Sequence, residues 1–189
     1  MKKFSAILML AMALTVMSTA APAQINSNIG QVTLNAQLNE SLTVTVNSGA
    51  LITFNLAPNT AANAGNTTSS ITTAWVLKPG RTSVAVWAYF GSAAVALLHQ
   101  TAGNPTDIPS SAVGLKVNGA AAFSPMTVVS PFNAAASGLQ IGPSISITGL
   151  NKNSSRTDTL AYNIDTTVVP QLASDTYIGT MNIEAQATP

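Results

Sequence analysis

Polar and hydrophobic residues alternate strictly over residues 31–38, which run Gln-Val-Thr-Leu-Asn-Ala-Gln-Leu. Successive side chains of a β-strand point to opposite faces, so the pattern predicts a half-buried strand with Val32, Leu34, Ala36 and Leu38 on its apolar face. Two interpretations are open. The segment is either the first strand of its own domain or a free arm that completes the sheet of a neighbouring molecule.

The same two-residue period returns in short runs along the rest of the chain, with almost no helical period. Asn47-Ser48-Gly49 and Asn118-Gly119 between runs are turn signals, and residues 93–98 fit either a strand or one helical turn. About nine or ten short strands at roughly 8–12-residue spacing predict an all-β fold, a single antiparallel Ig-like β-sandwich. The predicted strands cover residues 31–38, 41–46, 51–56, 71–77, 82–90, 113–117, 121–123, 139–147, 157–164 and 177–187.

The two most strand-like runs, residues 71–77 and 82–90, are separated by Lys-Pro-Gly-Arg. If they paired directly across this turn, Trp75 would share the inner face with the apolar residues of the second run. Trp87 and Tyr89 would then lie on the opposite face. Pro-Gly favours a type II turn, however, which is not the usual turn of a hairpin.

The first residues have the pattern of a Sec-type signal peptide. Lys2 and Lys3 precede an apolar run over residues 6–17, and Ala-Pro-Ala at 21–23 provides a small-x-small cleavage site. We therefore expect residues 1–23 to be removed, 24–39 to form an N-terminal arm and 40–189 to form the sandwich. The expected location is extracellular or at the cell surface. The mature chain has no apolar run of the length that a membrane span requires.

Charge excludes some classes of function. Charged residues are 7% of the chain, and two of its seven basic residues leave with the signal peptide. The few remaining cations do not make the basic patch of a nucleic-acid binder. The chain has no cysteine, so an exported fold cannot depend on disulfides. Low charge and many small polar residues favour a structural or binding module.

No pattern of residues points to catalysis or to a cofactor. His99 is the single histidine, which leaves a transition-metal site without enough nitrogen or sulfur ligands. No G-x-S-x-G motif occurs, and the scattered acidic residues form no local pair or calcium-loop pattern. We expect the protein not to be an enzyme, with no catalytic, metal-binding or cofactor-binding residues.

Trp87 and Tyr89 stand at positions i and i+2 and share one face of their strand. Three interpretations are open for this pair: it fills a core, it contacts a neighbouring subunit, or it forms a platform on which sugar rings stack.

Both ends of the chain resemble a known family. Residues 41–46 (Ser-Leu-Thr-Val-Thr-Val) leading to 52–56 (Ile-Thr-Phe-Asn-Leu) look like the start of a chaperone–usher pilin of the spore coat U type. The ending over residues 175–183 (Asp-Thr-Tyr-Ile-Gly-Thr-Met-Asn-Ile) is similar to the closing strand of those subunits and of many bacterial Ig-like sandwiches.

The resemblance implies that the subunit's own sheet lacks a strand, which the arm of the next subunit supplies. Val32, Leu34, Ala36 and Leu38 would then enter the groove of a neighbouring copy by β-augmentation. A head-to-tail contact of this kind does not close and so generates a filament. Such pilins usually carry a disulfide near their start, whereas this chain has no cysteine. Assembly with a periplasmic chaperone and usher, and assembly without them, both stay open.

The leading hypothesis is therefore an exported structural subunit of a pilus-like surface filament, with further copies of itself as partners. The alternative is a monomeric surface module that binds polysaccharide or acts as an adhesin through Trp87 and Tyr89.

Overall fold

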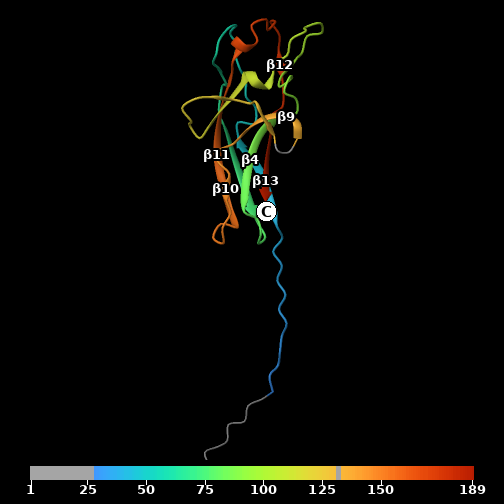
Figure 1. The fold of residues 1–189 in the computed structure, drawn as a ribbon, viewed down its shortest axis with the longest axis vertical. Coiled ribbons are helices and arrows are strands. Elements are labelled where there is room, and N and C mark those ends of the chain that lie inside the picture. Colours follow the sequence, from blue (N-terminus) through green and yellow to red (C-terminus); the bar gives the residue numbers. More distant parts are fainter. Residues whose placement is uncertain (1–27, 131–132) are drawn as a thin grey trace, which may run out of the picture. The chain divides into compact units, whose positions relative to one another are not determined.

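The computed structural model describes residues 28–130 and 133–189. The predicted signal peptide over 1–23, and residues 24–27 of the arm, lie outside this part. The chain divides into two units, Met1–Gln37 and Leu38–Pro189. The second unit is all-β with antiparallel sheets, arranged as a sandwich (Figure 1). Its described helices are two three-residue 3₁₀ turns, η1 (Ser110–Ala112) and η2 (Thr166–Val168).

The first sheet has the strand order β1-β3-β11-β6-β7, with β2 beside β11. The register pairs Thr45 with Thr72 across β1 and β3, and Thr72 with Thr157 across β3 and β11. β1 pairs only with β3 among the described strands, so it forms one edge of the sheet. The strands are β1 (Ser41–Ser48), β2 (Asn63–Ala64), β3 (Ser69–Val76), β6 (Val113–Val117), β7 (Ser124–Pro125) and β11 (Asn153–Ile164).

The second sheet is built around β4. β9 and β10 share one side of β4, because they pair with residues 87–90 and 83–84 of that strand. β13 pairs with β4 along residues 83–89 on its other side and has no second partner in the described part of the chain. The short strands β5 and β12 pair with each other in a separate sheet. The strands are β4 (Ser83–Phe90), β5 (Leu98–His99), β8 (Val128–Ser130), β9 (Asn133–Gln140), β10 (Ile145–Ser146), β12 (Tyr177–Ile178) and β13 (Asn182–Thr188).

The pairings define two ends of the sandwich. The base carries the start of β1, the turn at 77–82, the loop at 147–152 and the C-terminal residue Pro189. The crown carries the segments 49–60, 91–112 and 165–181. In Figure 1 the crown is the end at which β12 is labelled.

The core lies between the two sheets. Alternate residues of β3 and β4 are fully buried, as period-2 strands with one face on a core require. β1 and β13 differ, because their inward side chains are only half-buried or exposed. These two strands lie next to each other at the rims of opposite sheets, so the sandwich is less well covered along this line. We name it the open seam. The buried core residues include Ile71, Val86, Ala88, Leu115, Ile141, Leu160 and Ile164.

Arg156 connects the two sheets by a partly buried polar bridge at the side away from the open seam. Its Nε donates to Oδ2 of Asp158 at 2.7 Å, and its terminal nitrogens donate to the carbonyls of Ile141 and Pro143 at 2.7 and 2.8 Å. Asp158 is 1% exposed and accepts a second hydrogen bond from Nδ2 of Asn118. A buried carboxylate is tolerated only when it is paired and hydrogen-bonded.

Several sequence predictions are confirmed. Strands occur at 41–48, 69–76, 83–90, 113–117 and 153–164, close to the predicted ranges. Asn118 and Gly119 both have positive φ, as the turn signal indicated. The partner of β6 across this turn is β7, however, and not residues 121–123. Residues 93–98 form no helical turn, and only Leu98 of this segment belongs to a strand.

The direct pairing of residues 71–77 with 82–90, which the sequence left open, does not occur. β3 and β4 belong to different sheets, and the Pro-Gly turn carries the chain from one sheet to the other. Gly80 has a φ of +96°, consistent with a type II turn, whose twist does not suit a hairpin. Trp75 and Val84 still meet in one core cluster, because both face inward from opposite sheets.

Residues 31–38 are not a strand in the structure, so the first interpretation of this segment, a strand of its own domain, is wrong. Residues 139–147 and 177–187 are each interrupted. β9 and β10 are separated at Gly142-Pro143, where Gly142 has positive φ, and β12 and β13 are separated at 179–181.

Replacing Arg156 with Met tests the polar bridge. Removing one partner leaves the carboxylate of Asp158 buried without its cation, so we expect the free energy of unfolding to fall by about 3–5 kcal/mol. Urea unfolding of the mature chain measures this. The control is Lys78→Met, which removes a cation with a largely exposed side chain and should change stability by less than about 1 kcal/mol. Equal effects of the two variants would contradict the role of Arg156.

Candidate functional site

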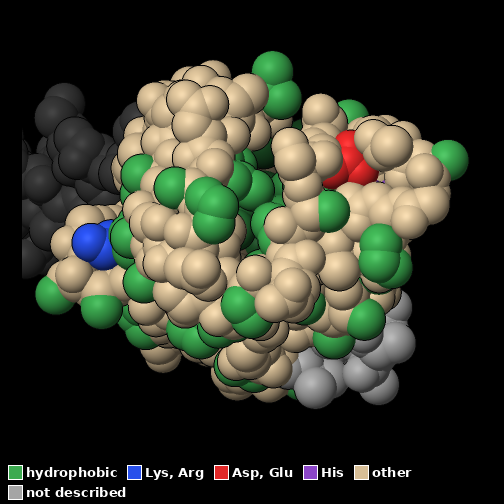
Figure 2. Space-filling model, turned by 90° about the horizontal axis from the view of Figure 1, so that it is seen from above, with side chains coloured by type: hydrophobic (Ala, Val, Ile, Leu, Met, Phe, Trp, Pro, Cys, Tyr) green, Lys and Arg blue, Asp and Glu red, His purple; other side chains and the backbone are tan. Residues whose placement is uncertain are grey.

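An apolar groove of about 1130 Å³ opens along the open seam toward the crown. One wall is the segment 51–57, which continues the first sheet beyond β1, and the other is the segment 172–183, which leads into β13. Between them lie core side chains of both sheets. Figure 2, seen from above, shows a hollow with hydrophobic side chains inside it. The apolar residues of the lining include Ile52, Phe54, Leu56, Phe90, Leu97, Tyr162, Ile164, Leu172, Met181 and Ile183.

The first wall is an extended segment that pairs on one side only. Phe54 forms a bridge with Gly65, flanked by a hydrogen bond from the backbone N–H of Asn66 to the carbonyl of Thr53 at 2.9 Å. In an antiparallel pair, the backbone groups of successive residues point to opposite sides. Since those of Thr53 face Asn66, those of Ile52 and Phe54 point to the opposite side, toward the groove. The side chains of Ile52, Phe54 and Leu56 pack partly buried against the core.

Buried polar contacts hold the first wall in place. Asn63 Oδ1 accepts from the backbone N–H of Ala57 at 2.7 Å, and its Nδ2 donates to the carbonyl of Ile164 at 2.9 Å. Thr166 Oγ1 donates to the carbonyl of Ala57 at 2.7 Å. Gly49, at a φ of +67°, turns the chain out of β1 against the backbone of Thr68, where a Cβ atom would clash. The wall is therefore formed without a second strand beside it.

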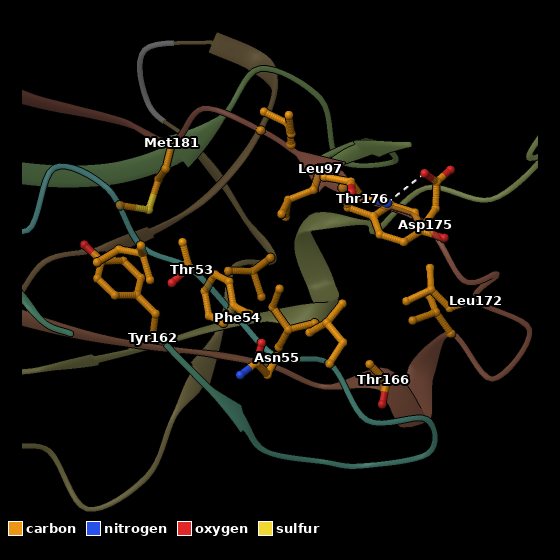
Figure 3. A pocket seen from close by; sticks show the side chains of 18 of the residues that line it. Thr53, Phe54, Asn55, Leu97, Tyr162, Thr166, Leu172, Asp175, Thr176 and Met181 are labelled. Atoms are coloured by element: carbon orange, nitrogen blue, oxygen red, sulfur yellow. Dashed lines mark hydrogen bonds between the residues drawn. The ribbon is translucent and has the colours of Figure 1, made fainter. Parts of the chain in front are cut away.

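The second wall comes from the last segment of the chain. Met181 and Ile183 pack against the core, and the outer edge of β13 beside them is unpaired among the described residues. Gly179 separates β12 from β13 at a point where a Cβ atom would collide with the carbonyl of Ala96. In Figure 3, Met181 and Phe54 come from opposite walls, and Tyr162 lies near both.

Asp175 holds the rim of the second wall. Its carboxylate accepts hydrogen bonds from the backbone N–H and Oγ1 of Thr101 at 3.0 and 2.8 Å, from Nδ2 of Asn104 at 2.8 Å and from the backbone N–H of Thr176 at 2.7 Å (Figure 3 shows the last). These donors, Asn104 first, hold the pKa of Asp175 well below its usual range. Tyr177 adds a hydrogen bond from its hydroxyl to the carbonyl of Ala173.

The groove suits an extended peptide better than a small molecule. Tyr162 at its inner side uses its hydroxyl to donate to Ser69 at 2.7 Å, and burial raises the pKa of this phenol. Two strand edges that present backbone groups, with apolar side chains between them, are the features of a β-augmentation site.

The four residues predicted as the donor face are all exposed to solvent. Val32, Leu34 and Leu38 are 85%, 89% and 79% exposed, and Ala36 is also exposed.

Trp87 and Tyr89 lie on the outer face of β4 and are half-buried, outside both core clusters, so the interpretation that they fill a core is wrong. The register places Glu184 and Gln140 on either side of Trp87. Tyr89 donates its hydroxyl hydrogen to Oε2 of Glu184 at 2.8 Å, and this bond raises the pKa of Tyr89.

His99 pairs with Asp107, whose Oδ1 lies 2.8 Å from Nδ1 and 2.9 Å from the backbone nitrogen of the histidine. The backbone hydrogen bond, followed by the one to the ring, lowers the pKa of Asp107. No group of three or more His, Cys, Asp or Glu gathers as a metal site in residues 28–130 and 133–189. Over the same described ranges, no helix has the length and apolar character to cross a membrane.

The sequence pattern predicted the side chains of both walls but not the groove between them. Ile52, Phe54 and Leu56 alternate with polar residues, as do Met181 and Ile183, which places each set on one face of a predicted strand. Alternation assigns a face to each residue but does not say how closely two sheet edges approach. The sequence feature that comes nearest to indicating the groove is Gly49, after which the chain leaves β1.

None of the family models, curated proteins or solved structures compared with the chain matches it.

Replacing Asp175 with Ala tests the rim. Because the folded-state pKa of Asp175 lies below its unfolded value, the carboxylate stabilises the fold above about pH 4 and loses this effect as the pH falls. We expect the stability difference between the parent and Asp175→Ala to shrink from pH 5 to pH 2. Thermal unfolding across this range measures it, and a difference independent of pH would contradict the assignment.

Proposed function

We propose that the protein is an exported structural subunit that polymerises into a surface filament by donating its N-terminal arm to a neighbouring copy. The observation that carries this proposal is the apolar groove between two strand edges that have no partner on its side among the described residues. The chain itself contains a segment of matching character, residues 31–38, which alternates polar and apolar and belongs to no strand.

The physical argument is one of complementarity. A strand added along the outer edge of the second wall, at the crown end of β13, would pair its backbone with that edge, and its alternate apolar side chains would enter the groove. Eight residues extend about 26 Å at roughly 3.3 Å each, comparable to a strand such as β4 of equal length. Burying each Val or Leu fully stabilises the contact by about 1.5–3 kcal/mol. The Ig-like character of the sandwich belongs to the same proposal, with the donated arm as its closing strand.

An isolated subunit would also leave β13 exposed as an edge, which is a recognised cause of uncontrolled association. Donation of the arm covers that edge with a strand of defined sequence. A periplasmic chaperone that occupies the groove before assembly is compatible with the same geometry.

The test of this proposal compares two faces of the arm. Val32→Asp with Leu34→Asp places carboxylates on the face expected in the groove and removes about 3–6 kcal/mol of apolar burial. We expect no filaments from this variant by negative-stain electron microscopy. Thr33→Asp with Asn35→Asp adds the same charge to the opposite face and should leave filaments.

A second measurement uses the variant that lacks residues 24–39. It should form no filaments but should bind a synthetic peptide of residues 29–40, detected by fluorescence anisotropy. The Val32→Asp, Leu34→Asp peptide should bind about a hundredfold to ten-thousandfold more weakly. Filaments of normal length from the truncated chain would overturn the proposal.

A second candidate function is an adhesive or polysaccharide-binding surface at Trp87 and Tyr89. It is favoured by the position of both rings outside the core, with Glu184 and Gln140 beside Trp87 as hydrogen-bonding groups. Aromatic faces stack on the apolar faces of sugar rings, while neighbouring carboxylates and amides bind hydroxyls.

For this candidate we expect Trp87→Ala to abolish retention of the mature protein on an insoluble glycan such as cellulose or chitin. Ala85→Ser, a mild change on the same outer face of β4, is the control. Equal retention of Trp87→Ala and the parent on each glycan would remove the candidate.

A further inference from the structure

The two ends of the sandwich each present an apolar surface. Leu150, in the loop between β10 and β11 at the base, is 99% exposed. At the crown, Leu98 and Ile178 face solvent at 49% and 59%. We propose that successive subunits also meet end to end, with Leu150 of one subunit seated against Leu98 and Ile178 of the next. This inference rests on the proposed filament and goes beyond the donated strand.

The direction of the donated strand follows from the topology. β1 runs from base to crown and β13 from crown to base, because Ser41 pairs with Val76 and Thr188 pairs with Ser83. An arm antiparallel to β13 ends with Leu38 at the acceptor's crown. The opposite direction would bring the donor's domain to the acceptor's base, where the acceptor's own residues 38–41 lie, and would favour a closed pair. The antiparallel direction therefore suits a filament, and every described strand pair of this chain also has it.

The length of chain between the arm and the domain then brings the two subunits into contact. Glu40 is anchored to the base, because its carboxylate accepts from Nε of Arg81 at 2.9 Å and lies 3.8 Å from Nζ of Lys78. Arg81 also donates to the carbonyl of Ala187. Asn39 alone separates Leu38 from this anchored residue, and two residues span at most about 7 Å. The base of the donor must therefore lie against the crown of the acceptor.

The loop that carries Leu150 is held in one conformation. Asn151 Oδ1 accepts from the backbone N–H of Thr148 at 2.7 Å, and Asn151 Nδ2 donates to the carbonyl of Ser146 at 2.9 Å. Trp75 donates its indole N–H to the carbonyl of Asn151 at 2.8 Å. A leucine displayed on a rigid turn loses little conformational entropy when it is buried in a contact.

The crown offers a recess for this side chain. Leu98 and Ile178 are register partners in the β5–β12 pair, and with Val95 they border a depression of about 370 Å³ beside Phe90. Ile178, Gly179 and Thr180 line both this recess and the groove, so the two surfaces are continuous. A subunit that receives the arm therefore presents its apolar recess next to the point at which the donor's domain begins.

Cysteine pairs test the contact, because the chain contains no cysteine of its own. The mature chain with Leu150→Cys and Ile178→Cys is polymerised and mildly oxidised, and its products are separated without reductant. We expect a ladder of dimers, trimers and longer species. A disulfide within one subunit is excluded, since the eight residues of β4 separate base from crown by about 26 Å and Cα atoms must approach within about 7 Å. Leu150→Cys with Thr157→Cys, on the outer face of β11, is the matched control.

A ladder only from the first pair supports the end-to-end contact. If filaments form normally but both cysteine pairs oxidise equally slowly, the end-to-end contact is overturned, while the proposal of the donated arm still stands. An absence of filaments from the unmodified mature chain would overturn both proposals. A further variant, Leu150→Asp, separates the end-to-end contact from the donated arm. In the mature chain it should shorten filaments. In the variant that lacks residues 24–39 it should leave the binding of the 29–40 peptide unchanged. Filaments of parental length from Leu150→Asp would count against the contact.

Discussion

The open seam is the constraint on which the rest of the structure depends. β1 and β13 are the rims of two different sheets, and neither is hydrogen-bonded to a second strand in the described part of the chain. The backbone groups of an edge strand must bond to water or to another chain, and the inward side chains of such a strand are only half covered. The core, the groove and the proposed assembly all depend on how the backbone groups and side chains along the open seam are satisfied and covered.

The two rims of the open seam are held differently at the base and at the crown. At the base, Arg81 joins Glu40 to the carbonyl of Ala187 and so ties the two rims together. Toward the crown, the rims diverge, and each is held by hydrogen bonds on the side away from the groove. Asn63 and Thr166 bond to one wall, and Asp175 bonds within the other. The groove is thus pre-organised by polar contacts that lie outside it, which lowers the entropic cost of binding a strand.

The sequence predicted the strands better than their arrangement. Alternation identified β1, β3, β4, β6 and β11, because a two-residue period reports which face of a strand is buried. It failed wherever the answer depended on distant partners. β3 and β4 are adjacent in sequence but lie in different sheets, and the pattern of Trp75 and Val84 is the same in either arrangement. Residues 31–38 show as strict an alternation as any segment yet form no strand, since alternation marks a face suited to burial but does not supply a strand to pair with.

The position of β1 and β13 in different sheets has a mechanical consequence. In a filament built by strand donation, tension enters a subunit through its own arm, which continues into β1, and leaves through the accepted strand, which is proposed to pair with β13. Tension would load the hydrogen bonds between β1 and β3 and between β13 and β4 in shear. It would cross from one sheet to the other through the side chains packed in the core and through Arg81, which contacts both Glu40 and the carbonyl of Ala187. The mechanical strength of such a fibre would therefore depend on the packing between the two sheets of each subunit.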